Sequence, residues 1–194
     1  MELKSKQLSF IAIMAALGNV LSFITINMAP FMPNFPGTNI SMALDLSHLS
    51  TFIASLYGGP LVGGLTGLVG GAVAAFEFGF SKGNMVAGIG LPIGKALTGI
   101  AAGIIFKKLD VTVNKIYSLV VTVISYIPEG IFTYFLFVYL YPIFIGLSVE
   151  LVTSIAISIL TKAFLEMIAM GIILIGLFSN QAFLKYLQNY FTSK

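Results

Sequence analysis

The stretch from Ala43 to Ala75 reads ALDLSHLSTFIASLYGGPLVGGLTGLVGGAVAA, and it decides the fold. It opens with an acid and the only histidine of the chain, continues as an apolar segment, and turns at the Gly-Gly-Pro of residues 58–60. Small residues then recur at every fourth position, at Gly59, Gly63, Gly67, Gly71 and Ala75. A ladder of this kind lets a second helix backbone approach closely within a lipid bilayer. We therefore expect this segment to pack against another helix in a membrane bundle.

The composition places the whole chain in a membrane. Hydrophobic residues make up 58% and charged residues 9% of the 194 residues, and the mean hydropathy is +1.01, which excludes a water-soluble globular protein. We expect one integral membrane domain over residues 1–194. There is no cysteine, so disulfides and thiolate metal sites are excluded. The formal charge of +3 comes from lysine alone and is too small to indicate a nucleic-acid surface.

The apolar segments predict an all-α bundle of about six membrane-spanning helices. We expect them at Leu8–Met28, Ala43–Tyr57, Pro60–Phe80, Met85–Phe106, Ile116–Leu140 and Glu150–Phe178. The last of them is long enough to be tilted in the bilayer. Residues 181–191 place their apolar side chains on one side, which predicts a short amphipathic helix that lies in the membrane interface.

The positions of the lysines predict how the chain is oriented. With six spans, one side of the membrane receives Lys4, Lys6, Lys107, Lys108, Lys115, Lys185 and Lys194. Only Lys82 falls on the other side, so we expect both termini in the cytoplasm and the connection Ala29–Met42 outside. This connection is rich in proline and asparagine and long for a helical hairpin. It either covers an outward-facing cavity or is an ordinary ordered connection.

Ionisable side chains within the spans indicate a candidate binding site, because charges in hydrocarbon are costly and usually face the bundle interior or a water-filled cavity. Lys162 and Glu166 are spaced to pair on their own helix, which leaves open whether they do more than neutralise each other. Lys95 and Glu129 have no partner within one helical turn, so each must be matched across helices or by a ligand. Tyr126, one turn before Glu129, either contacts a small polar ring or belongs to the core.

Further polar residues at the outer ends of the spans form a possible rim of this site. They are Asp45, His48 and Glu77, of which Asp45 is also well placed to cap the second helix. Residues 90–96 resemble a phosphate-binding loop but lack its spacing and the Ser or Thr after the lysine. One histidine and no cysteine leave little for a transition-metal site, and no nucleophile–base pair is visible. We expect no metal, no cofactor and no catalytic activity.

Several of these segments resemble a known family. The first span contains Ala12-Ile-Met-Ala-Ala16, the second and third contain LDLSHL and GGPLVGGLTGLVGG, and the fourth contains GLPIGKALTGIAAGIIFKKL. In this order, and with six spans and this length, the chain resembles the substrate-binding S component of an energy-coupling factor (ECF) transporter. The resemblance covers nearly the whole chain.

The resemblance implies a plasma-membrane protein that binds a vitamin or similar micronutrient with high affinity near the outer face. Besides the lipid bilayer and the small-molecule substrate, it implies two kinds of protein partner, a transmembrane coupling protein and two cytoplasmic ATPases. It implies no nucleic-acid partner. Ala12 and Ala16 match the family's docking surface for the coupling protein. Carried onto this chain, the substrate-binding set is Asn34 or Asn39, Asn84, Lys95, Glu129 and Lys162, to which Tyr126 adds a ring.

The ligand and one rival function remain open at this point. The mixed set of Lys95, Lys162 and Glu129 suits a ligand that bears both an acid and hydrogen-bond donors. There is no tryptophan, so a tryptophan-sandwiched ring, as in thiamine-binding relatives, cannot be built. The rival is a self-sufficient ion-coupled secondary transporter in which Glu129 and Glu166 relay protons or cations. Such carriers often contain inverted repeats, and no convincing repeat relates the first three spans to the last three.

Overall fold

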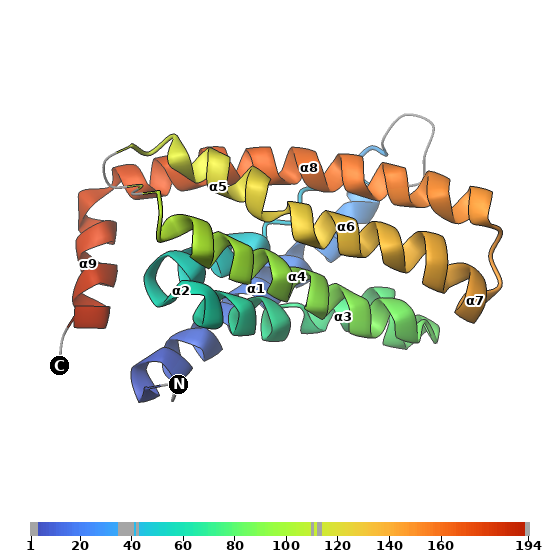
Figure 1. Cartoon of the computed structure of the whole chain (residues 1–194), viewed down its shortest axis with the longest axis horizontal. Helices are drawn as coiled ribbons and strands as arrows, with labels where there is room; N and C mark the ends of the chain where they lie inside the picture. Colours follow the sequence, from blue (N-terminus) through green and yellow to red (C-terminus); the bar gives the residue numbers. More distant parts are fainter. Residues whose placement is uncertain (1–3, 35–40, 42, 110, 112–113, 193–194) are drawn as a thin grey trace.

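The computed structural model describes residues 4–34, 41, 43–109, 111 and 114–192, and the regular secondary structure in this part of the chain is helical apart from one isolated antiparallel bridge between Asn34 and Ser41 (Figure 1). Five stretches in it are long and apolar enough to cross a membrane: Ser5–Phe31, His48–Lys82, Met85–Phe106, Tyr117–Ile145 and Val149–Ser179. We expected about six. The difference arises because the second and third expected spans together make the single stretch His48–Lys82.

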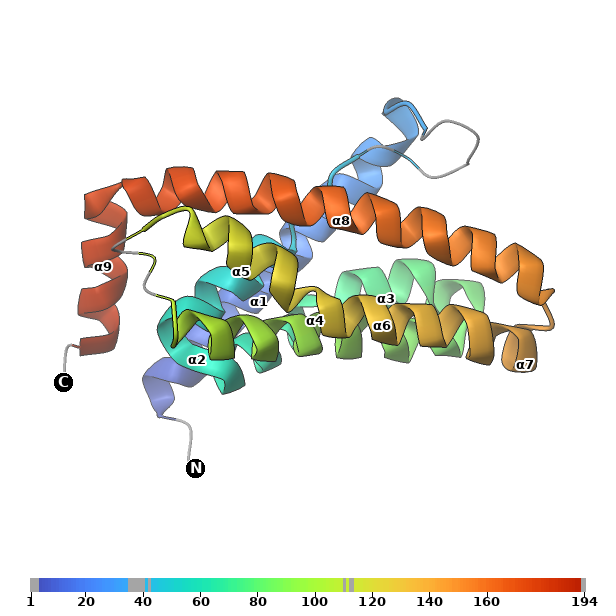
Figure 2. The same ribbon diagram turned by 45° about the horizontal axis from the view of Figure 1, so that its top comes forward.

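The helical elements are bounded as follows: α1 Ser5–Met28, η1 Ala29–Phe31, α2 His48–Gly70, α3 Ala72–Phe78, η2 Phe80–Lys82, α4 Met85–Phe106, α5 Tyr117–Ser125, α6 Ile127–Phe135, the π-helical η3 Leu136–Leu140, α7 Tyr141–Ile145, α8 Val149–Ser179 and α9 Gln181–Thr192. Most of them run along the long axis of the molecule, whereas α1 crosses the others obliquely (Figure 2). Both termini lie near the same end of the molecule (Figure 1).

The turn that the sequence predicts at residues 58–60 is present inside α2. Gly59 leaves the helical conformation with φ 75° and ψ −169°, in a region that favours glycine, and Pro60 begins the next helical segment. A Cβ atom on Gly63 would lie 2.1 Å from the Ser55 hydroxyl oxygen. Residues eight apart in a straight helix are about 12 Å apart, so the chain doubles back here. The prediction that this helix begins at Ala43 is wrong, because residues 43–45 are not helical and the helix begins at His48.

The glycine ladder packs against α4, as expected. A Cβ atom on Gly67 would lie 2.4 Å from the Lys95 carbonyl oxygen, and one on Gly63 would lie 2.7 Å from the Gly99 carbonyl oxygen. Ser55 also donates a hydrogen bond of 2.9 Å to the Gly99 carbonyl. Close backbone approach maximises van der Waals contact where lipid leaves little hydrophobic drive between helices. The ladder therefore fixes the position of α4 along and around α2 at the level of Lys95.

A second break, between α2 and α3, is bridged by a side chain of α1. The Asn19 amide donates to the Val69 carbonyl and its oxygen accepts from the Val73 amide, each at 3.0 Å. Unsatisfied backbone groups are costly within a bilayer, so one asparagine stabilises both sides of the break at Gly71.

The last two spans differ in continuity. Tyr117–Ile145 changes helix type or direction at Tyr126 and again at Leu136, and Pro128 and Pro142 stand in the first turns of α6 and α7. By contrast α8 is unbroken over 31 residues, or about 46 Å, which exceeds a hydrocarbon core of about 30 Å and agrees with a tilted span.

The amphipathic tail forms the helix α9, as predicted. It turns sharply away from the direction of α8 (Figure 1). Phe183 and Leu184 pack against the main core. Its place in the membrane interface stays a prediction.

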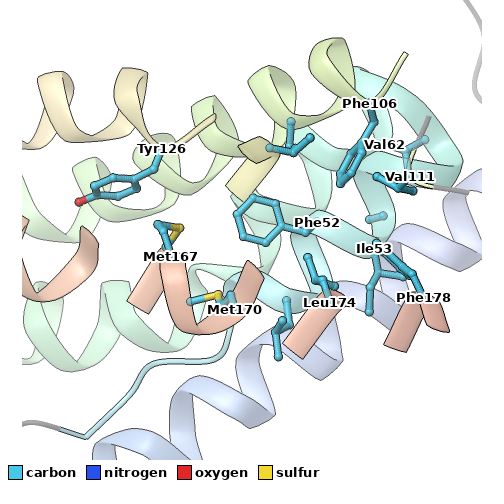
Figure 3. Packing of buried hydrophobic residues seen from close by; sticks show 14 of the residues in the cluster. Phe52, Ile53, Val62, Phe106, Val111, Tyr126, Met167, Met170, Leu174 and Phe178 are labelled. Carbon is cyan, nitrogen blue, oxygen red and sulfur yellow. The ribbon is translucent and has the colours of Figure 1, made fainter. Parts of the chain in front are cut away.

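That core fills the end of the bundle where α4 ends and α5 begins. Phe52, Met170, Leu174 and Phe178 are fully buried in it, and side chains from α2, α4, α5 and α8 meet there (Figure 3). Tyr126 stands apart from Phe52 with its hydroxyl pointing away from the cluster (Figure 3). Beyond Tyr126 the bundle is hollow.

Candidate functional site

A cavity of about 540 Å³ lies inside the bundle, next to the core. Its walls come from α1, η1, α2, α3, α4, α6, η3, α7 and α8, together with residues before α2 and Tyr126 between α5 and α6. Pockets for small molecules usually measure about 300–1,000 Å³, so the cavity has the size of a small-molecule site.

The first ionic contact of the cavity joins α4 to the segment before α2. Lys95 Nζ lies 3.7 Å from Asp45 Oδ2 and donates a short hydrogen bond to the Ser47 hydroxyl. Asp45 Oδ1 accepts a 2.9 Å hydrogen bond from the backbone amide of Ser47, and Ser47 is the N-cap residue of α2. Burial raises the pKa of Asp45, but the charges of Lys95 and His48 and the bonds from Ser47 outweigh it, so the pKa stays below its usual value. Asp45 thus holds the start of α2 from outside the helix.

The second contact joins α2 to α6. His48 Nε2 lies 3.0 Å from Glu129 Oε2, and the Thr98 hydroxyl donates to the same oxygen at 2.5 Å. The His48 and Glu129 side chains are both buried. A Cβ atom on Gly94 would lie 3.1 Å from Glu129 Cγ, so the lack of a side chain at residue 94 helps Glu129 of α6 to pack closely on α4. Glu129 is matched across helices, which was one of the two expectations for it.

The third contact lies on α8. Lys162 Nζ is 3.5 Å from Glu166 Oε1, as the four-residue spacing predicts. The same Glu166 oxygen also accepts a 2.9 Å bond from the Asp45 amide. Glu166 therefore ties α8 to the segment before α2, and it lines the cavity. The predicted site set omits Glu166, because its spacing to Lys162 explained it without any contact to another element.

Six of the predicted site and rim residues line the cavity: Asp45, His48, Lys95, Tyr126, Glu129 and Lys162. Asn84 does not line it, but it positions a residue that does. Its oxygen accepts from the Ala87 amide at 3.0 Å and caps α4, while its amide donates to the Tyr141 hydroxyl at 2.8 Å.

Three other predicted residues are not brought to the cavity by the described structure. Asn34 is exposed and pairs with Ser41 in the isolated bridge. Asn39 lies outside the described residues. Glu77 lies at a separate, more open hollow that Asn19 and Phe23 of α1 also border. Glu77 is therefore not a rim residue of the cavity among α2, α4 and α8.

The opposite end of the cavity is apolar and aromatic. Phe78, Phe137 and Tyr141 line it, and the rings of Phe137 and Tyr141 stack with their centroids 4.4 Å apart. From Lys95 to Ala87, which also lines this end, α4 rises by about 12 Å. Sequence reasoning missed these aromatic residues, because 17 phenylalanines and 8 tyrosines offer no signal that distinguishes three of them.

The comparison with known families now decides what kind of protein contains this cavity. A family model described as "ECF transporter, substrate-specific component" matches residues 6–178. The chain belongs to this family. Substrate-specific (S) components are substrate-binding subunits of ECF transporters and are not enzymes, so this S component is a multi-pass membrane transport protein. No curated protein and no solved structure matches it.

The two residues that we expected from the sequence to dock on a coupling protein lie outside the cavity. Ala12 and Ala16 are both exposed on α1. Large apolar side chains next to them, Ile13, Leu17 and Val20, are 40–59% exposed. This S component therefore presents exposed apolar side chains on the N-terminal half of α1, with two small residues one helical turn apart among them.

Proposed function

We propose that this S component is the high-affinity substrate-binding subunit of an ECF-type ABC importer for a vitamin or similar micronutrient, and that the substrate binds in the 540 Å³ cavity. One observation carries the proposal. Three ionic contacts from different elements converge on a hollow within a membrane bundle, next to a packed core. Charges so placed in a membrane protein usually mark a substrate path or site.

The polar residues in and around the cavity have different roles in this proposal. Lys95, Glu129 and Lys162 bind the polar groups of the substrate, and Tyr126 offers its hydroxyl beside them. Asp45 and His48 hold Lys95 and Glu129 in place, and Asn84 acts through Tyr141. Ala29 and Ser41, near the two ends of the connection between α1 and α2, also line the cavity, which supports a covering role for that connection with Asn34 and Asn39.

The topology that we propose has six spans with both termini in the cytoplasm. The reversal at Gly59 supports two short spans within His48–Lys82, and the two chain ends near one end of the molecule support an even number of crossings (Figure 1). The lysines outside the spans favour the same orientation. In this orientation the cavity lies toward the outer face, where a substrate-binding subunit meets its substrate.

Ala12 and Ala16 dock on the transmembrane coupling protein, which works with two ATPases. Replacing both with tryptophan is expected to abolish co-purification with these partners and ATP-dependent uptake in proteoliposomes, while substrate binding to the isolated subunit stays unchanged. The matched control is Ile172→Trp on α8, where Ile172 is 60% exposed. This control is expected to preserve both readouts. Loss of substrate binding in the alanine variants would contradict separate binding and docking surfaces.

The rival function, a self-sufficient ion-coupled carrier, makes the opposite prediction for energy supply. The S component alone, reconstituted without ATP and without partners, is expected to bind its substrate but not to concentrate it. Concentrative uptake by the isolated chain, driven by a proton or sodium gradient, would contradict the proposal and favour the carrier.

A further inference from the structure

The charged side chains of the cavity already neutralise one another. Its described lining contains three carboxylates, from Asp45, Glu129 and Glu166, against Lys95, Lys162 and His48. The walls therefore carry no net charge when the imidazole is protonated and one negative charge when it is neutral. Each lysine has a carboxylate within 4 Å, so neither is left as an unpaired cation for an acidic ligand.

The hydrogen-bonding capacity that remains is mostly that of acceptors. Glu129 Oε2 accepts from Thr98 and contacts His48, and Glu166 Oε1 accepts from the Asp45 amide. The second oxygen of each carboxylate receives no hydrogen bond from the described residues, and neither does the Tyr126 hydroxyl. Carboxylate oxygens can each accept further bonds, so these atoms match N–H donors on a ligand. Lys162, whose side chain is 21% exposed, offers the donor beside them.

The distribution of side chains along the cavity specifies the rest of the ligand. The charged end and the aromatic end are about 12 Å apart along α4. Stacked rings such as Phe137 and Tyr141 favour a flat apolar group next to them. The polar group of the ligand then lies at the charged end, between α4, α6 and α8.

Building on the function proposed above, we propose that the substrate is a nitrogen-containing ring compound of net charge zero or +1, with N–H donors directed to Glu129 and Glu166 and a flat apolar part among Phe78, Phe137 and Tyr141. A carboxylate or phosphate on the ligand would add a negative charge, and the described walls have no unpaired cation to neutralise it. In a region of low dielectric constant it would be strongly repelled by the carboxylates. The sequence led us to expect that the mixed set of Lys95, Lys162 and Glu129 suits a ligand bearing both an acid and hydrogen-bond donors; the proposal keeps the donors and drops the acid.

The test identifies which compound the full chain retains from a complex mixture. The purified protein in lipid nanodiscs is incubated with the low-molecular-weight fraction of yeast extract, washed, and analysed by native mass spectrometry with identification of the retained compound. We expect an uncharged or singly cationic nitrogen heterocycle. Retention of a compound with a net negative charge would overturn the inference and leave the proposed function intact. Retention of nothing would contradict the proposed high-affinity binding itself.

A pair of variants tests the same point through the affinity for the retained compound, measured by isothermal titration calorimetry. Glu166→Gln is expected to weaken binding by about tenfold, the usual effect of losing a hydrogen bond to a charged group. Lys162→Gln is expected to weaken binding by about threefold, less than Glu166→Gln does, since it removes a donor to the ligand but also frees the Glu166 carboxylate from its lysine partner. Thermal unfolding of both variants controls for folding. The reverse order of effects would show that the ligand is an acid held by Lys162.

Discussion

The two ends of the bundle are built on opposite principles, although α4 contributes to both. At the end near the termini, α2 and α4 touch backbone to backbone through Gly63 and Gly99, and fully buried side chains such as Phe52 fill the remaining space. At the other end the helices separate around a 540 Å³ cavity with charged walls. Gly67 marks the boundary, because it packs directly on the Lys95 carbonyl. The tightly packed end thus determines where the charges of the hollow end stand.

The contrast between the two ends also explains why the bundle tolerates buried charges around the cavity. Breaking a buried ion pair leaves an uncompensated charge, which is costly in a medium of low dielectric constant. Each pair therefore needs its partners held within contact distance, by two separate elements for Lys95–Asp45 and His48–Glu129 and by the single helix α8 for Lys162–Glu166. Close packing at one end supplies that rigidity without filling the other end.

The largest expected effect comes from breaking the tight end at its boundary. Gly67→Leu places a side chain where even a Cβ atom would lie 2.4 Å from the Lys95 carbonyl oxygen. We expect a loss of about 3 kcal/mol in the free energy of unfolding, from overpacking between α2 and α4. Substrate binding is expected to fall with it, because Lys95 shifts. Thermal unfolding in detergent and calorimetric binding measure the two effects.

The matched control for Gly67 is Gly176→Leu on α8, where a Cβ atom meets nothing within 4 Å. This variant is expected to be at least as stable as the native chain, because leucine favours a helix more than glycine does. Equal destabilisation at both positions would contradict the claim that close helix contact at Gly67 supports the cavity.

A smaller effect is expected from the hollow end. Glu129→Gln removes the charge that His48 contacts and weakens the bond from Thr98, at an estimated cost of about 2 kcal/mol. Substrate binding is expected to fall by more than tenfold, about 1.4 kcal/mol or more. The control is Glu150→Gln in the exposed first turn of α8, for which neither quantity should change. Native substrate affinity in the Glu129→Gln variant would show that the Glu129 carboxylate does not bind the substrate.

The smallest effect concerns the break between α2 and α3, which lies alongside the cavity. Asn19→Ala deletes two hydrogen bonds to the backbone on either side of Gly71, and we expect the unfolding free energy to fall by about 1 kcal/mol. Asn27→Ala is the comparison, since among the described residues Asn27 bonds within its own helix alone, to the Phe23 carbonyl. If the two variants have the same midpoint of unfolding, Asn19 does not support the break.

Sequence reasoning located the parts of the molecule that stand out chemically. Lys95 and Glu129 are visible because only 9% of the residues are charged and these two interrupt apolar spans. The turn at Gly59 is visible because a Gly-Gly-Pro run interrupts a helix. The break at Gly71 is not, since a glycine within a regular ladder looks like packing. The charge of Glu166 was explained by Lys162, four residues before it on the same helix. Its bond to the Asp45 amide joins residues far apart in the chain, which residue spacing cannot predict.

The central claim is that the hollow end of the bundle, and no other surface, binds the substrate. The most direct test is a crystal or cryo-EM structure of the full chain bound to the compound that it retains from yeast extract. We predict ligand density inside the cavity, with its polar groups near Glu129 and Lys162 and its flat part near Phe137. Density at the open hollow beside Glu77, or on the outside of the bundle, with the cavity empty would contradict the account.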